Sequence, residues 1–285
     1  DARHGVFGGA LETLGVLALA ASGVLAGRGM ARWRSPWWQV ATAGLLLGLV
    51  LLALPRRIYG LEYVAPFSWL MAGRREFAVV AWLVSAVLSL LGRRLDSPRK
   101  RLMVIGFMAI VVIIQGALPF LMPGLTVGRL QGLRTTVDGE GICHQTTGFT
   151  CGPAAAVTVL RQLGIHGEEG EIAILAKSSF NAGTGADCLS EALEARYLAE
   201  GVRCRFVRLA RVSELQGHEP AMVAVKLGMM VDHFVAVLAV TPEAIIVGDP
   251  LSGKVTMDHA SFEGIWRGGA VLVSRTVPEP ITEAP

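Results

Sequence analysis

The hydrophobic residues of this chain follow two different patterns, and the change falls near residue 123. Before that point, polar stretches separate four long apolar segments, at residues 6–27, 36–55, 77–92 and 102–122. A bilayer core about 30 Å thick requires about 20 helical residues, so the first, second and fourth segments are long enough to span a membrane. The third segment is short, and we expect Arg74, Arg75 and Glu76 to lie at its interfacial end.

Beyond residue 140 the pattern predicts helices first and strands afterwards. We expect helices at residues 151–164, 168–179 and 185–201. The strand-like runs that follow are "VRCRFVRL", "AMVAVKL", "DHFVAVLAV", "AIIVGDP" and "GAVLVSR". This order is typical of an α+β domain with a mainly antiparallel sheet. The predicted organisation is an α-helical transmembrane region of about four spans at 1–122, a linker at 123–139, an α+β domain at 140–276 and a flexible tail at 277–285.

The composition supports a membrane protein and argues against several other classes. The chain is 52% hydrophobic and only 17% charged, which lies on the membrane side of the globular range. A net charge of +3 without a basic-aromatic pattern does not indicate nucleic acid as a partner. The four cysteines form no CxxC pair, so we expect neither a zinc site nor a disulfide scaffold, and no cofactor. The first apolar segment lacks a basic n-region and a clear cleavage site, so no cleavable signal peptide is expected.

The short polar loops predict the orientation in the membrane. Loops 28–35 and 93–101 hold eight Arg and Lys residues, against five spread over the opposite side. The positive-inside bias therefore places these two loops in the cytoplasm and everything after Met122 outside, on the outer face of a bacterial inner membrane. Loss of the third span would reverse the side of the C-terminal domain. Glu12, the only acidic residue in the first span, is expected to reach the headgroups from near the helix start.

One stretch, "QTTGFTCGPAA", has the features of a nucleophile site. Cys151 stands where a helix is predicted to begin, and a helix N-terminus stabilises a thiolate, which is the reactive form of cysteine. Pro153 suits the first turn because it lacks an N–H that would be unpaired there. Gln145, on the preceding loop, is a candidate donor to an oxyanion beside the Cys151 backbone N–H. A buried structural thiol remains the alternative.

A thiol nucleophile needs a base, and His233 is the best placed of six histidines. It heads the apolar strand "DHFVAVLAV", whereas the others fall in polar, loop-like or helix-edge positions. Asp249 ends the next predicted strand and is the expected orienter of His233. Asp232 is the rival, although adjacent strand residues point to opposite faces. The alternatives are that His233 merely starts a strand and that Asp249 opens a turn before Pro250.

Taken together, "QTTGFTCGPAA", "DHFVAVL" and "VGDPLSGKV" resemble the C39 family of papain-like cysteine peptidases, over roughly residues 140–275. The resemblance implies a papain-like α+β fold in which Gln145 shapes the oxyanion hole, Cys151 attacks, His233 is the base and Asp249 orients it. It also implies peptide or protein precursors as substrates, cleaved after small residues such as Gly-Gly.

The chain departs from the family members found in peptide exporters. Those are cytoplasmic and precede a transporter and an ATPase domain, whereas here the spans come first and no GxxxxGK[ST] loop exists. Thr150 stands where exporters often have an acidic residue. The favoured hypothesis is a membrane-anchored cysteine peptidase. The alternatives are a non-catalytic peptide-binding or assembly subunit of a membrane complex and, last, a Cys/His metal site. The remaining cysteines, Cys143, Cys188 and Cys204, are expected to be buried or, if the domain lies outside, partly disulfide-bonded.

Overall fold

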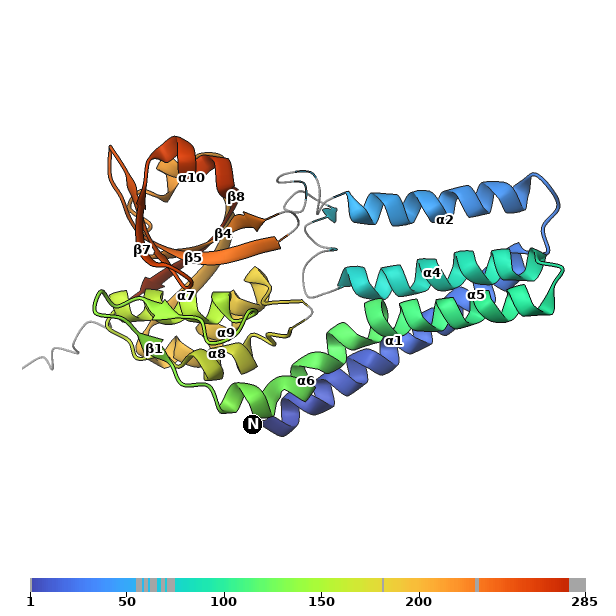
Figure 1. Cartoon of the computed structure of the whole chain (residues 1–285), viewed down its shortest axis with the longest axis horizontal. Coiled ribbons are helices and arrows are strands. Elements are labelled where there is room, and N and C mark those ends of the chain that lie inside the picture. The colour runs from blue at the N-terminus through green and yellow to red at the C-terminus, as the bar shows by residue number, and fades with distance from the viewer. Residues whose placement is uncertain are drawn as a thin grey trace, which may run out of the picture. The chain divides into compact units, whose positions relative to one another are not determined.

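The computed structural model describes residues 2–54, 58, 61, 66–67, 70, 75–180, 182–228 and 231–276. The chain divides into two compact units, residues 1–127 and 128–285. The first unit is helical, and the second combines helices with an antiparallel sheet (Figure 1). The predicted tail at 277–285 lies outside the described residues.

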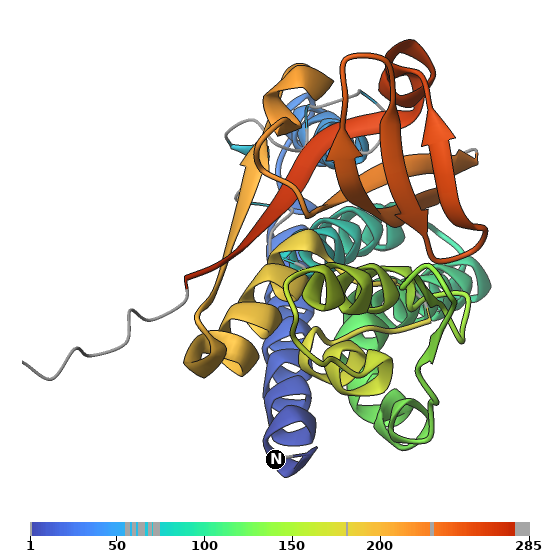
Figure 2. The same cartoon turned by 90° about the vertical axis from the view of Figure 1, so that its left-hand side faces the viewer.

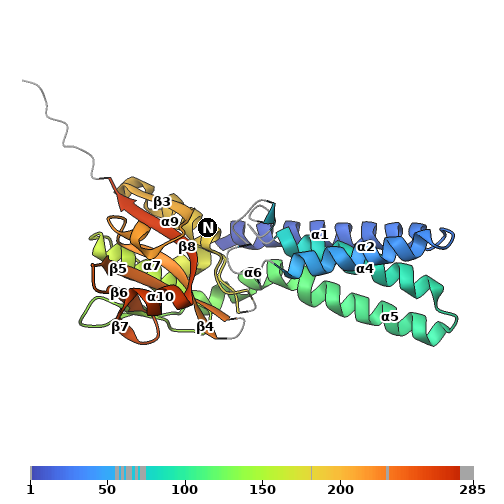
Figure 3. The same cartoon turned by 90° about the horizontal axis from the view of Figure 1, so that it is seen from above.

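Apolar helices build the first unit and run side by side in two perpendicular views (Figure 1 and Figure 3). They are α1 (Ala2–Met30), α2 (Trp37–Ala53), α4 (Arg75–Arg94) and a continuous helix made of α5 (Pro98–Val111), a π-helical stretch (Val112–Ala117) and α6 (Leu118–Gln131). Among the described residues, three stretches are long and apolar enough to cross a membrane: Leu11–Met30, Arg75–Arg94 and Pro98–Gln131.

The lengths of two helices differ from those expected. The third segment is longer, because α4 takes in Arg75 and Glu76 at its start and Arg93 and Arg94 at its end, and reaches 20 residues. The second is shorter, since α2 has 17 residues and ends at Ala53. Helix α6 continues to Gln131, so the first part of the predicted linker at 123–139 is helical. The domain boundaries at 122 and 139 stay predictions.

Two glycines of α1 set its packing against α4. A Cβ at Gly23 would lie 2.5 Å from the Trp82 carbonyl oxygen, and one at Gly27 would lie 2.2 Å from the Ala86 carbonyl oxygen. Both glycines lie one helical turn apart, so they form a small-xxx-small stripe on which the α4 backbone rests directly. The helical unit is therefore held by close backbone approach, with Ala81, Ala86 and Leu90 of α4 fully buried.

The second unit contains a six-stranded antiparallel sheet in the order β3-β8-β4-β5-β6-β7. Its strands are β3 (Val202–Arg208), β4 (Ala221–Gly228), β5 (Val231–Val240), β6 (Ile245–Asp249), β7 (Gly253–Met257) and β8 (Trp266–Arg275). Helices α7 (Cys151–Gln162), α8 (Glu169–Leu175) and α9 (Ala186–Tyr197) precede the sheet in the chain. The predicted α+β organisation, with three helices followed by an antiparallel sheet, is therefore confirmed.

Both faces of the sheet are covered. Helices α7, α8 and α9 lie on one face and α10 (His259–Ile265) on the other (Figure 2). On the first face, α7 buries Ala155, Val159 and Leu160 against Met222 and Val271. On the second, Phe262 of α10 packs with Trp266, Val223 and Val237, among others. Strands β4 and β5 contribute to both cores, which explains why their sequences are apolar at nearly every position.

Some short elements were not anticipated from the sequence. The two-residue strands β1 (Thr136–Val137) and β2 (Cys143–His144) pair antiparallel ahead of the helices. Strand β7 and helix α10 follow the aspartate that ends β6. Their apolar residues are too few, or too interrupted by glycine and charge, to show a clear period.

The packing of α1 on α4 leads to a stability prediction. Gly27→Ala should lower the melting temperature of the detergent-solubilised chain, because the added methyl collides with the Ala86 carbonyl; overpacking typically costs about 1–3 kcal/mol. Gly15→Ala is the matched control, since nothing lies within 4 Å of a Cβ there and alanine favours helix. Equal melting temperatures for the two variants would contradict the close approach.

Candidate active site

Cys151 is the first residue of α7. Thr150 precedes it, is fully buried, and accepts a hydrogen bond from the Thr147 N–H at 3.1 Å through its hydroxyl. The Thr150 carbonyl accepts the first intrahelical bond, from Ala154 N at 3.0 Å. Cys151 itself is half-buried, so its thiol lies at the beginning of a rigid, buried helix without being sealed off. The partial positive charge of a helix N-terminus interacts favourably with negative charge that develops at this position.

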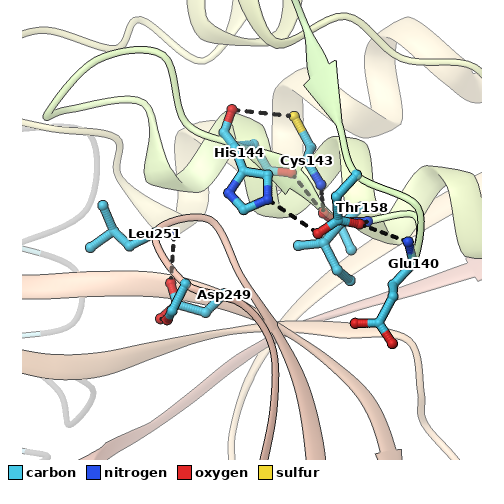
Figure 4. Close-up of polar contacts among 10 residues, drawn as sticks. Glu140, Cys143, His144, Thr158, Asp249 and Leu251 are labelled. Carbon is cyan, nitrogen blue, oxygen red and sulfur yellow. Dashed lines mark hydrogen bonds and ion pairs between the residues drawn. The ribbon is translucent and has the colours of Figure 1, made fainter.

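His233 lies on β5, and its side chain is almost completely buried, with 4% of its surface exposed. Its Nε2 atom is 2.7 Å from Oδ1 of Asp249, the last residue of the adjacent strand β6. The Asp249 carboxylate also accepts from the Leu251 N–H at 2.9 Å, as Figure 4 shows, and from the Ser252 hydroxyl. The turn after β6 therefore fixes the carboxylate, and the carboxylate fixes the plane of the imidazole.

The electrostatics of this pair favour the charged form of both partners. Burial lowers the pKa of His233, but the hydrogen bond to Asp249 and the interaction with the Cys151 side chain outweigh it and raise that pKa to about 9. Burial raises the pKa of Asp249, but its bonds to His233, Ser252 and Leu251 lower it to about 2. At neutral pH the site therefore holds an imidazolium between the Asp249 carboxylate and the Cys151 sulfur.

The rival aspartate and three of the other histidines form polar contacts with other residues. Asp232 points away from His233 and forms an ion pair with Arg267, with 2.6 Å between Oδ1 and Nη2. His144 pairs with Asp138 at 3.1 Å, His166 lies 3.4 Å from Glu168, and the His259 ring is 2.8 Å from the Thr241 carbonyl. Of the two aspartates considered from the sequence, it is Asp249 that contacts the His233 ring.

Gln145 lies on the loop between β2 and α7. Its backbone N–H donates to the Pro250 carbonyl at 3.0 Å, which joins this loop to the turn that follows Asp249. Its side-chain Nε2 donates to the Thr147 carbonyl at 2.9 Å. An amide nitrogen carries two hydrogens, so this bond leaves one N–H for a substrate oxygen.

A buried threonine of α7 anchors the strand that leads to Gln145. Thr158 accepts the Cys143 N–H at 2.9 Å through its hydroxyl and donates to the Ala154 carbonyl at 3.2 Å. Figure 4 shows Cys143, His144 and Thr158 together with Asp249. A Cβ at Gly248 would lie 2.7 Å from Ile142 Cδ1 and 3.1 Å from Thr158 Cγ2, so glycine at this position leaves room for both side chains against β6. The segments that carry Gln145, Cys151 and Asp249 converge at this point.

All four cysteines are free thiols, so the disulfides expected as one option are not formed. Burial and nearby glutamates raise the pKa of Cys143 to about 12, and burial together with Glu194 does the same for Cys204. Thiols with such pKa values do not ionise near neutral pH and are poor nucleophiles. Among the described residues, no cluster of His, Cys, Asp and Glu could hold a metal ion.

Three residues near the site were not identified from the sequence. The Ser252 hydroxyl donates a hydrogen bond to the carboxylate of Asp249, three residues earlier in the chain. The sequence Asp-Pro-Leu-Ser is typical of a turn and could have indicated this bond. Thr146 and Glu169 bond each other across 23 residues. A contact between segments that far apart has no local sequence signal.

The site combines a thiol at a helix start with a buried histidine bonded to an aspartate, and comparisons with known proteins assign the family. The model of the Peptidase C39 family matches residues 140–277. An uncharacterized protein of Methanothermobacter marburgensis is 32% identical over 143 residues, which are 50% of this chain and 94% of that protein. This chain therefore belongs to the peptidase C39 family, as the sequence motifs predicted.

Solved structures with a similar fold include two peptidase domains of transporters. One is the peptidase domain of Streptococcus ComA, a bifunctional ABC transporter of a quorum-sensing pathway; the match has 23% identity, covers 47% of this chain and 96% of that one, and has a TM-score of 0.42. The other is a double-glycine-motif protease of an AMS/PCAT transporter, solved with its leader peptide; it has 19% identity, covers 50% and 93%, and has a TM-score of 0.41.

The pKa of His233 provides a test of the geometry. In the unfolded chain the pKa is about 6.5, so the raised value stabilises the fold at low pH, and this contribution is lost as pH rises through about 9. Asp249→Asn should move the pKa of His233 down towards 6.5, because the variant removes the carboxylate charge. An NMR titration of the ring measures it. Asp232→Asn is the control and should leave the titration unchanged; an equal shift in both variants would contradict the assignment.

Proposed function

We propose that this protein is a membrane-anchored cysteine peptidase with Cys151 as nucleophile, His233 as base, Asp249 as orienter and Gln145 as oxyanion donor. The observation that carries the proposal is the buried His233 ring, bonded at 2.7 Å to Asp249 while it also interacts with the Cys151 side chain. A buried imidazole between a carboxylate and a thiol at a helix start is the combination that thiol catalysis needs.

The proposed cycle follows from these positions. The Cys151 thiolate attacks the carbonyl carbon of the scissile bond, and the new oxyanion accepts N–H bonds from Gln145 and from the Cys151 backbone. The His233 imidazolium then gives its proton to the leaving amine, and the C–N bond breaks to leave a thioester. Neutral His233 next takes a proton from water, whose oxygen attacks the thioester. Release of the acid regenerates the thiolate and the imidazolium.

The surface of the helical unit supports the membrane anchor. Large apolar side chains stand exposed along the helices, among them Leu11, Leu25, Val50, Leu102, Met103 and Phe107. A soluble protein rarely exposes apolar surface on this scale, whereas lipid chains would cover it at no cost. We propose that α2 also spans the bilayer, although it is shorter than the other three helices.

The contact between the two basic loops supports four crossings. The Arg94 guanidinium donates to the Trp33 carbonyl at 2.8 Å and lies 4.8 Å from the centroid of the Trp38 ring. The α1–α2 and α4–α5 turns therefore lie at the same end of the helical unit (Figure 1). Both turns carry the basic residues that favour the cytoplasmic side. With four crossings, the orientation that we propose for the peptidase domain is the outer face of a bacterial inner membrane.

We propose a secreted or membrane-bound precursor as the substrate, cleaved after small residues such as Gly-Gly. The membrane anchor keeps the catalytic domain near the bilayer, so its effective concentration near substrates in the same membrane is raised. Membership of the C39 family supports the preference for double glycine. Small residues beside the scissile bond would let an extended chain approach Cys151 closely.

The roles of Cys151 and His233 are tested by activity. Cys151→Ala and His233→Ala should each abolish cleavage of precursor peptides by the purified, folded full chain, because each removes a reacting group. Cys204→Ala is the matched control, since its thiol has a pKa of about 12 and should not react. Mass spectrometry of the products measures cleavage. Binding of the peptide without cleavage by the wild type would instead indicate a non-catalytic peptide-binding subunit.

The side of the membrane is tested by protease accessibility. In intact spheroplasts, added protease should digest the C-terminal domain, because four crossings put it outside. A cytoplasmic marker protein in the same cells should survive until the membrane is permeabilised. A domain that is protected until permeabilisation would place the chemistry in the cytoplasm and contradict the proposed orientation.

A further inference from the structure

The loop that carries Gln145 is bonded to a buried carboxylate outside the four proposed active-site residues. Glu169, in the first turn of α8, has no exposed surface. Its Oε1 accepts the Thr146 N–H at 2.8 Å and its Oε2 accepts the Thr146 hydroxyl at 2.5 Å. Burial of a polar group costs free energy unless it is hydrogen-bonded, and here both carboxyl oxygens have a partner on Thr146.

The position of Glu169 is itself fixed. Its backbone N–H donates to the Thr135 hydroxyl at 2.9 Å, and Thr135 also donates to Glu168. A Cβ on the next residue, Gly170, would lie 2.3 Å from the Leu130 carbonyl oxygen, so the backbone of α8 rests directly on residue 130. The carboxylate therefore belongs to a rigid part of the domain.

The bonds between Glu169 and Thr146 restrain the backbone next to Gln145, the proposed oxyanion donor. The N–H of Gln145 is bonded to the Pro250 carbonyl, and the N–H of the next residue, Thr146, is bonded to Glu169. Two consecutive backbone N–H groups thus have partners on different elements, which sets the position of Gln145 between them. The Gln145 side chain is then fixed by its own bond to the Thr147 carbonyl.

We infer that Glu169 is a positioning residue for the oxyanion hole, acting through Thr146 on Gln145. The inference rests on the proposed peptidase function. Glu169 does not contact the thiol or the imidazole in any of the bonds described, so it should affect the stabilisation of the oxyanion and leave the activation of Cys151 alone.

Two reactions of the same thiol separate these effects. Alkylation by iodoacetamide is a displacement at carbon that forms no oxyanion, so its rate reports the Cys151–His233 pair. Hydrolysis of a peptide ending in Gly-Gly-aminomethylcoumarin passes through a tetrahedral oxyanion, so its kcat also reports the Gln145 donor. A general loss of structure would slow both reactions, whereas a displaced donor slows only the second.

The experiment compares Glu169→Leu with the wild-type full chain in detergent. We expect kcat to fall roughly tenfold to a hundredfold, since an error of about 1 Å in a catalytic group costs about that much, with KM and the rate of alkylation unchanged. Gln145→Ala is the reference and should show the same split. Glu169→Gln should restore most of kcat, because its amide oxygen accepts the Thr146 N–H and its NH₂ donates to the Thr146 hydroxyl.

Two further variants keep the test decisive if Glu169→Leu fails to fold. Thr146→Val, on the exposed side of the contact, should lower kcat several-fold, whereas Thr146→Ser, which keeps the hydroxyl, should not. Glu171→Leu is the matched control, since that carboxylate lies on the same helix but faces Arg196, 2.7 Å from its Nε.

Unchanged kcat in Glu169→Leu or, if that variant does not fold, in Thr146→Val would overturn this inference alone. Absence of any hydrolysis by the wild type would overturn the peptidase proposal, and this inference with it.

Discussion

The hydrogen bond from the Cys143 N–H to the Thr158 hydroxyl holds together the parts of the domain that carry the candidate site. It is buried, it ties β2 to the middle of α7, and it lies where Gly248 lets β6 approach both elements. Without it, a backbone donor would be left unpaired in the core, which costs about 1–3 kcal/mol. Three of the four proposed active-site residues, Gln145, Cys151 and Asp249, lie at the ends of the segments that meet there, and His233 is bonded to Asp249. Their geometry thus depends on packing several residues away from the chemistry.

Electrostatics then distinguish one thiol from the others. Cys143 and Cys204 lie in apolar surroundings beside glutamates, which keeps them protonated. Cys151 lies instead at the start of α7, next to an imidazole that Asp249 keeps charged at neutral pH. The protein needs no metal or cofactor to activate this thiol in the proposed mechanism, because a helix N-terminus and an imidazolium supply the positive potential.

The two units of the chain are stabilised by different kinds of packing. In the helical unit, Gly23 and Gly27 allow backbones to touch, and large apolar side chains stay outside. In the C-terminal unit, large apolar side chains are inside, in two cores on either side of one sheet. The first arrangement suits lipid, where burial of apolar groups between helices gains little, and the second suits water.

The sequence by itself determined the order of elements, the family and the candidate residues. Periodicity and length indicated the apolar helices, the helices α7 to α9 and most of the strands, because these features depend on neighbours close in the chain. The motifs around Cys151, His233 and Asp249 pointed to thiol chemistry for the same reason. Only the tertiary structure decided which aspartate contacts His233, since Asp232 turns to Arg267. It alone showed the bond between Thr146 and Glu169 and the close approach of Gly248 to Ile142 and Thr158, because residues far apart in sequence come together only in the folded domain.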